Sequence, residues 1–275
     1  MAISTEEFDL IRNFIHEHSG IVINPGKEYL IENRLTVIMV QSGCDNFKDL
    51  HAKLQNDPGP LRTKVIDAMT TNETLWFRDD SFATALASHI VPELINKART
   101  ASQVRIWSAA CSTGQEPYSI GMLLLDTLSK TSSPPPLSKF SILATDLSPS
   151  AIVLASSGRY SQLAISRGMR PEFLERYFKK NGMVYELIPD IRGLVKFQQF
   201  NLKSPFTEHG KFDFLLCRNV LIYFSDELKR QIYTKIRDSL NKDGILAIGA
   251  SESPRGYTTA FQQVMMGGAA LYRPI

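Results

Sequence analysis

The stretch VRIWSAACSTGQEPYSI, residues 104–120, decides the fold class of this 275-residue chain. Its first part, Val104 to Ala109, is a short apolar run of the kind that forms a buried strand. A turn containing one glycine, Gly114, follows, and helical periodicity then runs from about Glu116 to Leu128. A buried strand that leads through a tight turn into a helix is typical of a parallel sheet covered by helices.

The same alternation of strand and helix continues towards the end of the chain. Further strands are predicted at Phe140 to Ala144, Leu194 to Phe200, Phe212 to Cys217 and Gly244 to Gly249. A helix capped by Ser225 is expected between the last two, with apolar residues at helical spacing as far as Leu240. The final segment, from Phe261 to Arg273, carries Gly267-Gly268 and predicts a closing antiparallel hairpin.

The opening segment has a different, helical character. Ser4 and Glu7 form a capping box at a helix start, and Lys27 to Gln41, Phe47 to Leu54 and Leu61 to Met69 read as further helices. The breaker Asp57-Pro58-Gly59-Pro60 separates the last two. We therefore expect a small helical domain over residues 1–70 and an α/β domain over residues 71–275.

One segment of the α/β domain does not fit the alternation. Asn181-Gly182 lies between the segments Tyr177 to Lys180 and Met183 to Leu187, and this dipeptide is a strong signal for a two-residue hairpin turn. We expect an inserted β-subdomain at about residues 177–194.

Composition excludes several classes of protein. Apolar runs such as Ala151 to Ala155 reach about five residues, whereas a membrane span needs about 20, and the start lacks a signal-peptide pattern. The three cysteines, Cys44, Cys111 and Cys217, suit neither a disulfide framework nor a zinc site. We expect a cytoplasmic protein with no membrane insertion, no metal and reduced thiols.

Charge is distributed unevenly along the chain. Residues 1–70 carry 7 basic and 10 acidic side chains, whereas Arg159 to Lys196 carries 8 basic against 4 acidic ones. The second stretch is therefore the better candidate for meeting an acidic partner, although a solvated surface of mixed charge is an equal alternative. A nucleic-acid surface would be more one-sided, so we expect no nucleic acid as a partner.

Polar side chains follow four of the predicted strands, and in parallel sheets ligands bind beyond the carboxyl ends of the strands. They are Glu116, in the turn and helix start after the first strand, Asp146 after the second, Asn201-Leu202 after the third, and Arg218 and Asn219 after the fourth. The first turn lacks the G-x-G-x-x-G of dinucleotide sites, which disfavours NAD or FAD. Asp146 suits a ribose hydroxyl, but the alternative that it caps the next helix stays open.

The segment from Thr70 to Asp79, at the domain boundary, crowds polar groups and large aromatic residues together. Trp76 and Phe77 are expected to pack in the core. Asn72, Thr74 and Arg78 have no such structural duty and are candidates for binding.

These residues carry a family resemblance. The chain resembles the CheR-type chemoreceptor glutamate O-methyltransferases of bacterial chemotaxis. The matching pieces, in family order, are Thr70 to Asp79, Cys111 to Ser119, Thr145 to Ser148, Asn201-Leu202, Cys217 to Phe224 and Gly249 to Ser253. The resemblance implies a class I methyltransferase with a Rossmann-like, mostly parallel sheet, an N-terminal helical domain that faces the receptor, and S-adenosylmethionine as the cofactor.

The resemblance also implies roles for individual residues. It puts Asn72, Thr74 and Arg78 at the methionine end of the cofactor and the substrate approach, Glu116 at its amino acid group, Asp146 at the ribose, Asn201 and Leu202 at the adenine, and Arg218 and Asn219 in the rest of the pocket. Tyr223 is then the candidate for orienting the reacting carboxylate, with Arg78 attracting it.

The implied partner is the acidic helical bundle of a chemoreceptor, with a receptor C-terminal tail peptide on the β-subdomain as a further possibility. In the family the second helix is often rich in arginine. Here Arg34 is followed by Thr36 to Val40, so docking there would use Lys27, Arg34 and apolar contacts. We expect a monomer. Alternatives are a methyltransferase for another protein or a small molecule, and a catalytically silent cofactor-binding scaffold.

Overall fold

The structure, a computed structural model, describes residues 3–56 and 59–275, which form two compact units. The first unit holds the described residues up to Thr71 together with Tyr223–Lys229, and the second holds Asn72–Ile222 and Arg230–Ile275. The first boundary between the units, after Thr71, lies one residue beyond the predicted domain boundary. Segment 223–229, however, which we expected in the α/β domain, groups with the helical unit because it pairs with the chain after the first helix, through Ile21 and Phe224.

The first unit is helical, as its sequence pattern predicts. Its helices are α1 (Thr5–Ser19), α2 (Glu28–Gln41), α3 (Phe47–Asn56) and α4 (Pro60–Met69). The capping box is confirmed: the Ser4 hydroxyl accepts a hydrogen bond from the amide of Glu7, and the Glu7 carboxylate accepts one from the amide of Ser4. Of the predicted breaker, Asp57-Pro58 lies outside the described residues.

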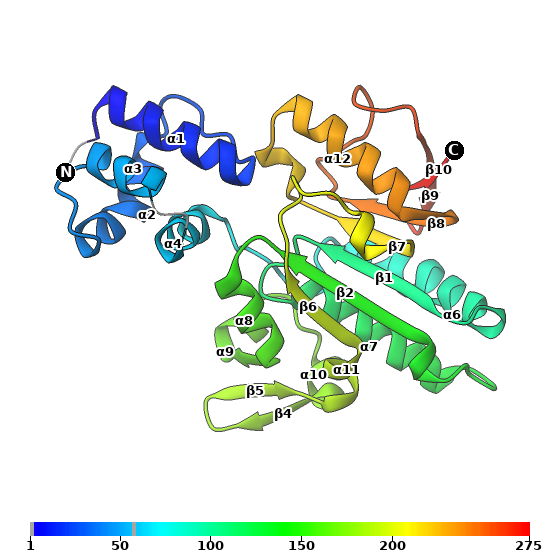
Figure 1. Cartoon of the computed structure of the whole chain (residues 1–275). Coiled ribbons are helices and arrows are strands. Elements are labelled where there is room, and N and C mark those ends of the chain that lie inside the picture. Colours follow the sequence, from blue (N-terminus) through cyan, green and yellow to red (C-terminus); the bar gives the residue numbers. More distant parts are fainter. Residues whose placement is uncertain (1–2, 57–58) are drawn as a thin grey trace. The chain divides into compact units, whose positions relative to one another are not determined.

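The second unit is built on a seven-stranded sheet (Figure 1). In the order in which they lie side by side, its strands are β6 (Val195–Gln199), β2 (Phe140–Asp146), β1 (Val104–Ala109), β7 (Phe212–Cys217), β8 (Leu240–Ile248), β10 (Ala269–Pro274) and β9 (Phe261–Met266). The first five run parallel, and β10 runs antiparallel to both β8 and β9. The predicted α/β class and the closing hairpin are confirmed.

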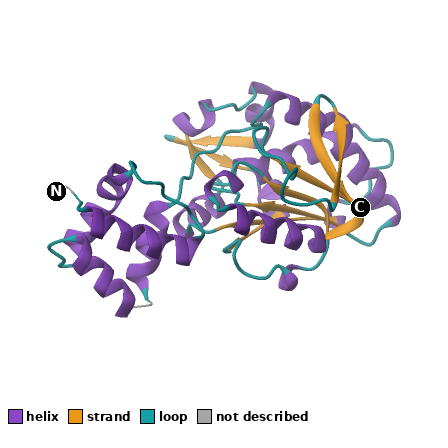
Figure 2. Cartoon of the chain, turned by 90° about the horizontal axis from the view of Figure 1, so that it is seen from above, coloured by secondary structure: helices purple, strands orange, loops and turns teal. Residues whose placement is uncertain are grey.

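Helices cover both faces of this sheet, as Figure 2 shows. A nearly continuous helical run leads into β1 through α5 (Asp80–Ala85), the π-helical turn η1 (Leu86–Ile90) and α6 (Val91–Thr100); the crossover from β1 to β2 uses α7 (Gln115–Lys130) and the short turn η2 (Leu137–Lys139). Helix α12 (Asp226–Ser239) lies on the opposite face from α6 and α7 (Figure 1). Ser225 caps α12 through the amide of Leu228, as expected.

The expectation that Leu240 continues the helical stripe was wrong. Helix α12 ends at Ser239, and Leu240 opens β8, where it pairs with Phe212. The β8 ladder is irregular at this point, because the register shifts between Phe212 and Phe214. A bulge of this kind lets one strand be longer than its partner, and apolar periodicity alone does not reveal it.

The inserted β-subdomain exists but is larger than predicted. Its three strands lie in the order β3 (Arg159–Ser161), β5 (Val184–Leu187) and β4 (Phe178–Asn181), all antiparallel. The chain between these strands and their neighbours forms α8 (Pro149–Ser157), α9 (Gln162–Ser166), α10 (Pro171–Tyr177) and α11 (Pro189–Leu194). The predicted bounds of 177–194 therefore missed β3, which pairs with a strand more than twenty residues away in sequence.

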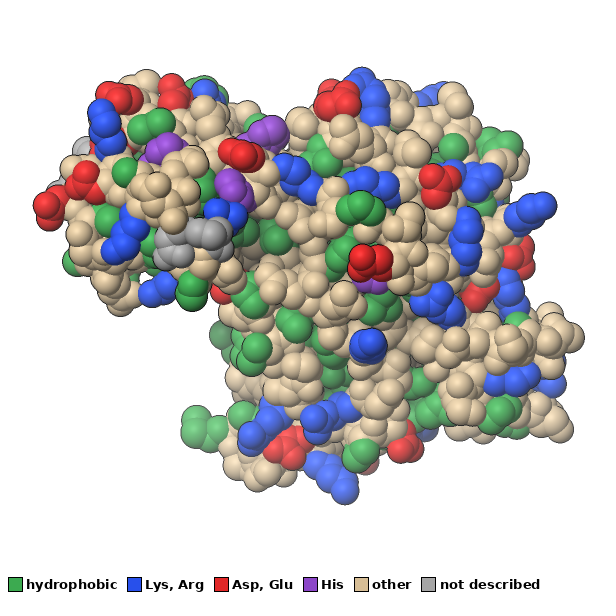
Figure 3. All heavy atoms as spheres, viewed as in Figure 1, with side chains coloured by type: hydrophobic (Ala, Val, Ile, Leu, Met, Phe, Trp, Pro, Cys, Tyr) green, Lys and Arg blue, Asp and Glu red, His purple; other side chains and the backbone are tan. Residues whose placement is uncertain are grey.

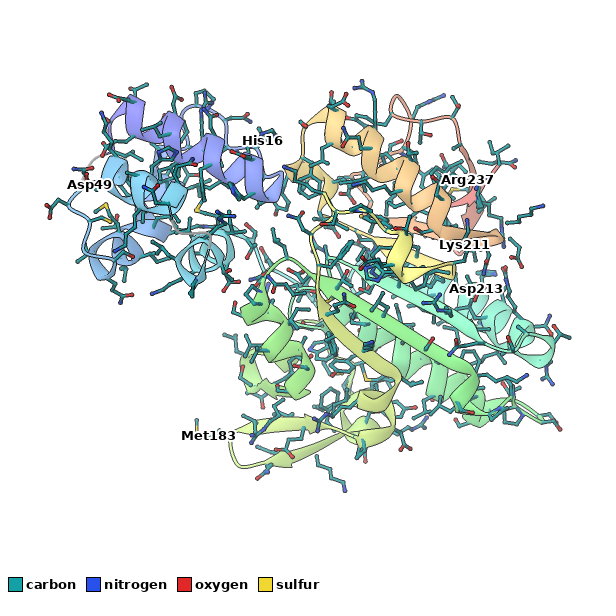
Figure 4. All side chains as sticks on the ribbon, viewed as in Figure 1. His16, Asp49, Met183, Lys211, Asp213 and Arg237 are labelled. Atoms are coloured by element: carbon teal, nitrogen blue, oxygen red, sulfur yellow. The ribbon has the colours of Figure 1, made fainter. Side chains whose placement is uncertain are left out.

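The hairpin turn is also displaced by one residue. Asn181 pairs with Val184, so the two residues of the turn are Gly182 and Met183. Gly182 has φ +58°, a value that glycine adopts without steric cost, and it occupies the first central position, as in a type II′ turn. Figure 4 shows the Met183 side chain at the tip, pointing away from the sheet.

No helix among the residues that the structure describes combines the length and the apolar character needed to cross a membrane.

Glu7 provides a test of how the helical unit is stabilised. Its carboxylate caps α1 and also accepts a hydrogen bond from the amide of Phe47 at 2.9 Å, which links α1 to α3. Burial alone raises the pKa of Glu7, but the hydrogen bonds from Ser4 and Phe47 outweigh burial, so its pKa lies below the ordinary value. The folded unit is therefore stabilised above the ordinary pKa of about 4.3, and this stabilisation disappears as pH falls through the lowered pKa.

We predict that Glu7→Gln weakens protection of the α1 amides from hydrogen exchange at pH 7 by about 1 kcal/mol. The difference from the wild type should shrink below pH 4, where the wild-type carboxyl also becomes neutral. Glu6→Gln is the matched control, because the Glu6 side chain is 71% exposed in its pair with Lys48. Equal effects of Glu7→Gln and Glu6→Gln would contradict a stabilising role of the Glu7 carboxylate.

Candidate functional site

The candidate site lies where the carboxyl ends of the central strands meet. The chain leaves β1 towards β2 and β6 on one side and returns to β7 on the other, so β1 and β7 are neighbours at the point where strand order reverses. In open parallel sheets, this reversal leaves a crevice beyond the strand ends. The side chains predicted from the sequence follow β1, β2, β6 and β7 and so belong to this edge.

The turn after β1 is strained and is held by the end of β2. Ala110 and Ser112 have φ values of +65° and +51°, which cost non-glycine residues about 1–3 kcal/mol each. The amide of Ser112 donates to Oδ2 of Asp146 at 2.7 Å, and the amide of Cys111 donates to the carbonyl of Thr145 at 2.9 Å. The Asp146 carboxylate therefore fixes the shape of this turn.

Asp146 does not cap the helix after β2. The cap of α8 is the hydroxyl of Ser148, which accepts a hydrogen bond from the amide of Ala151 at 3.0 Å. Oδ1 of Asp146 instead accepts from the amide of Ser148 at 2.9 Å. Asp146 is 8% exposed and lies between the two turns that follow β1 and β2, which is the place for a side chain that reads a ligand's hydroxyl groups.

Asn72 joins the junction segment to the same place. The nitrogen of its side-chain amide donates to the Ser148 hydroxyl at 3.2 Å, and its main-chain carbonyl accepts from the Ser112 hydroxyl at 2.9 Å. Asn72 and Asp146, which are far apart in sequence, therefore bind the same two serines.

A buried arginine holds a second part of the site. The side chain of Arg218 is 3% exposed and forms ion pairs with Glu116 at 2.9 Å and with Asp79 at 2.5 Å. Its guanidinium also donates to the carbonyl of Arg78 at 3.3 Å and lies 3.9 Å from the ring centroid of Phe82. A buried charge needs such compensation, so Arg218 links the β7 end to the β1 turn and to the junction segment.

Glu116 is itself fixed from two sides. Its Oε1 accepts a hydrogen bond from the Ser108 hydroxyl at 2.7 Å, while Oε2 pairs with Arg218. The carboxylate is thus oriented on the first turn of α7 before any ligand binds.

Glu252 organises the loop after β7, and our sequence reasoning assigned no role to it. Its Oε2 accepts hydrogen bonds from the amides of Asn219 and Gly249, each at 2.7 Å. Its Oε1 accepts from Val220 at 3.1 Å and from Leu221 at 2.8 Å. The only signal in the sequence was that Glu252 lies within a matching family piece.

Asn219 takes a left-handed conformation, with φ +59°, in this loop. Among the residues that the structure describes, none hydrogen-bonds to its buried Oδ1. A Cβ atom at Gly249 would lie 2.7 Å from both the amide nitrogen of the Asn219 side chain and Oε2 of Glu252, so a side chain there would disrupt the loop. The Oδ1 atom of Asn219 is thus an acceptor that could bind a ligand's donor group.

The loop after β6 lies beside Asp146. The amide of Phe200 donates to the carbonyl of Asp146 at 2.8 Å, and Oδ1 of Asn201 accepts from the amide of Lys203 at 2.9 Å. Leu202 is 7% exposed, and its carbonyl accepts from Lys235. The pair Asn201-Leu202 is therefore positioned next to the β2 end.

The side chains of three predicted residues are not joined to these contacts. Thr74 and Arg78 are half-buried, and no ion pair or hydrogen bond to another described residue involves the Arg78 guanidinium. Tyr223, in the short helix η4 (Leu221–Tyr223), belongs to the first unit, where its carbonyl accepts from the amide of Val22 at 2.9 Å.

Both parts of the chain match models of one protein family. Residues 72–269 match the CheR methyltransferase SAM-binding domain, and residues 6–70 match the CheR methyltransferase all-alpha domain.

Three curated proteins are similar to this chain over nearly its whole length. Chemotaxis protein methyltransferase 1 of Pseudomonas aeruginosa is 43% identical, with 99% of each chain covered. Chemotaxis protein methyltransferase Cher2 of Pseudomonas putida is 39% identical, also with 99% of each chain covered. A chemotaxis protein methyltransferase of Vibrio parahaemolyticus is 39% identical over 99% of this chain and 98% of the relative.

We predict that Glu252→Gln destabilises the second unit by about 2 kcal/mol, since glutamine offers one acceptor oxygen and no charge to four amides. Urea unfolding followed by the fluorescence of Trp76 and Trp107, both in this unit, measures the change. Glu172→Gln, at an exposed position at the start of α10, is the control. Unfolding curves that coincide for the two variants would show that the four amides do not depend on the carboxylate.

Proposed function

The chain belongs to the CheR methyltransferase family, and we propose that it transfers a methyl group to glutamate side chains of chemoreceptor cytoplasmic domains. It is an S-adenosylmethionine-dependent methyltransferase. The products in this proposal are a glutamate methyl ester, which serves sensory adaptation, and S-adenosylhomocysteine, which leaves with the electron pair of the broken sulfur–methyl bond. The observation that carries the proposal is the full-length similarity to chemotaxis methyltransferases, including both family domains.

The polar groups at the strand ends suit this cofactor chemically. S-adenosylmethionine, when bound, supplies an electrophilic methyl group on a positively charged sulfur, and it carries hydroxyl and ammonium donors. The site offers matching acceptors in the carboxylates of Asp146 and Glu116 and in the unpaired Oδ1 of Asn219. In our proposal Asp146 holds the ribose, and Glu116 and Asn219 hold the amino acid group.

The remaining assignments follow the family pattern. We propose that Asn201 and Leu202 bind the adenine, and that Asn72 and Thr74 border the methionine end. The contacts of Arg218 favour an indirect role: both of its terminal nitrogens are used by Glu116, Asp79 and the Arg78 carbonyl, so it completes the pocket by orienting these groups.

The reaction needs no general base. A glutamate side chain has a pKa of about 4.3 and is an anion at neutral pH, so the protein has only to bring its oxygen in line with the methyl carbon. Such positioning lowers a barrier by about 7 to 11 kcal/mol. We assign the attraction of the carboxylate to Arg78 and its orientation to Tyr223.

The contrast between the two site arginines supports this choice for Arg78. Arg218 is already neutralised by two carboxylates, whereas no described carboxylate pairs with Arg78. A very tight pair would stabilise the substrate as much as the transition state, so we propose that Arg78 orients the carboxylate and does not clamp it.

Receptor docking through α2 would be largely apolar in this protein. The guanidinium of Arg34 donates to the carbonyls of Met69 and Thr70, each at 2.9 Å, and so caps the end of α4. We had expected Arg34 to contact the partner, but these hydrogen bonds already occupy its guanidinium. Helix α2 instead exposes Tyr29, Val37 and Val40, at 53%, 62% and 64%. We propose that these three side chains, with Lys27, contact the receptor bundle.

The basic stretch from Arg159 to Lys196 contributes less free charge than its composition suggests. Its arginines Arg159, Arg167 and Arg176 pair with Glu186, Glu73 and Asp126. Lys179 and Lys180 on β4 form no ion pair with a described carboxylate, and Figure 3 shows Lys and Arg side chains gathered over the β4–β5 hairpin.

We propose a receptor tail peptide as a second ligand of this hairpin. Strand β4 is at the edge of the small sheet, and an extended peptide can add to such an edge through backbone hydrogen bonds. We propose this mode of docking for receptors that carry a tail, with the enzyme acting as a monomer in the cytoplasm.

The test is transfer of labelled methyl from S-adenosylmethionine to purified receptor cytoplasmic fragments, with and without their tails. We expect base-labile label on glutamate residues, located by mass analysis. Label on another protein or small molecule alone would favour a different substrate, and cofactor binding by calorimetry without any transfer would favour a silent scaffold.

We predict that Arg78→Ala lowers the rate of receptor methylation by about 10- to 100-fold, the loss expected for one charge-assisted hydrogen bond. The affinity for S-adenosylmethionine, measured by calorimetry, should fall much less. Arg99→Ala is the control, because Arg99 is exposed and its guanidinium donates to the surface carbonyls of Ser132 and Ser133. Equal losses in methylation and in cofactor affinity would assign Arg78 to the cofactor alone.

A further inference from the structure

One tyrosine connects the inserted sheet to the turn after β1. Tyr160, on β3, donates a hydrogen bond from its hydroxyl to the carbonyl of Thr113 at 2.8 Å. The side chain is buried, and a Cβ at Gly114 would lie 3.0 Å from the hydroxyl oxygen, so the phenol is packed directly against the turn. Burial raises the pKa of Tyr160, which keeps the hydroxyl protonated and able to donate.

The turn that receives this bond is the strained one. Thr113 lies between Ser112, with φ +51°, and Gly114, with φ +92°. Strained backbone persists only where its surroundings hold it. Asp146 restrains the turn by accepting a hydrogen bond from the Ser112 amide. Tyr160 restrains it one residue further on, by donating a hydrogen bond to the Thr113 carbonyl.

The same ring packs against the junction segment. The ring centroids of Tyr160 and Trp76 are 4.8 Å apart with an interplanar angle of 74°. Trp76 is anchored to the inserted region by two hydrogen bonds, from its indole nitrogen to the carbonyl of Ala164 and from its amide to the carbonyl of Arg167, each at 3.0 Å. Tyr160 thus contacts two of the chain segments that we connect with the cofactor, the turn after β1 and the junction segment.

We propose that Tyr160 is a positioning residue for S-adenosylmethionine: its hydrogen bond to Thr113 helps to fix the turn to which Asp146 binds, which makes the inserted sheet part of the cofactor pocket. The proposal rests on the placement of the cofactor at this edge of the sheet. It assigns to β3 a role in the binding of the cofactor, separate from any docking of a receptor peptide on β4.

The chain offers a matched control for this proposal. Tyr118, on α7, is 1% exposed and donates its hydroxyl to the carbonyl of Ala155 at 2.9 Å. Tyr118→Phe and Tyr160→Phe therefore each remove one buried hydroxyl and leave one buried carbonyl without its donor. They differ in that Ala155 belongs to α8, whereas Thr113 belongs to the cofactor turn.

The experiment measures the Kd of S-adenosylmethionine by calorimetry, the KM and kcat of methyl transfer, and urea unfolding for both variants. We expect Tyr160→Phe to raise Kd and KM about tenfold, the loss typical of one buried hydrogen bond whose acceptor is left unpaired, with kcat at saturating cofactor within about twofold. Tyr118→Phe should unfold at a similarly lowered urea concentration but leave Kd and KM within about twofold.

The outcomes separate this inference from the proposed function. Equal changes in Kd for the two variants, or no change for Tyr160→Phe, would overturn the positioning role. A Tyr160→Phe protein that fails to fold while Tyr118→Phe folds would also overturn it, because a positioning residue leaves the fold intact. A wild type that binds the cofactor but methylates no receptor fragment would contradict the proposed substrate and leave the role of Tyr160 in place.

Discussion

The buried guanidinium of Arg218 is the constraint on which the site depends. Removing a charged group from water costs several kcal/mol, and the protein offsets this cost with the carboxylates of Glu116 and Asp79. These residues come from the end of β7, the first turn of α7 and the junction segment, so their ion pairs hold three distant parts of the chain together. Glu116 is thereby oriented before a ligand binds. Binding then does not have to offset the entropic cost of ordering this side chain.

The backbone around this site is held in conformations that ordinary residues avoid. Asp79, Ala110, Ser112 and Asn219 all have positive φ. Three of them are restrained by a side chain from elsewhere in the fold: Arg218 pairs with Asp79, Asp146 binds the Ser112 amide, and Glu252 binds the Asn219 amide. Strain of this kind clusters at functional sites, where it shapes loops that a relaxed chain would not adopt.

The distribution of charge separates residues that build the site from those available to a substrate. Arg218 and Arg34 look alike in the sequence as candidates for binding acidic groups, yet one is neutralised by two carboxylates and the other caps α4. Arg78 has no such partner among the described residues, which is why our mechanism assigns the incoming carboxylate to it. The receptor surface that we propose is correspondingly apolar on α2, where valine side chains are exposed.

The sequence alone determined what depends on local pattern. The strands at Val104–Ala109 and Phe212–Cys217 were predicted with their observed bounds, and the capping box of Ser4 and Glu7 and the closing hairpin were also confirmed, because apolar periodicity and turn chemistry act over a few residues. The ordered motifs also identified the family. Only the tertiary structure decided that β3 joins the inserted sheet and that Glu252 binds four amides. It also decided that Arg218 forms ion pairs with two carboxylates and that Tyr160 donates a hydrogen bond to Thr113. Each of these depends on partners distant in sequence, and no local signal records which of them the fold brings together.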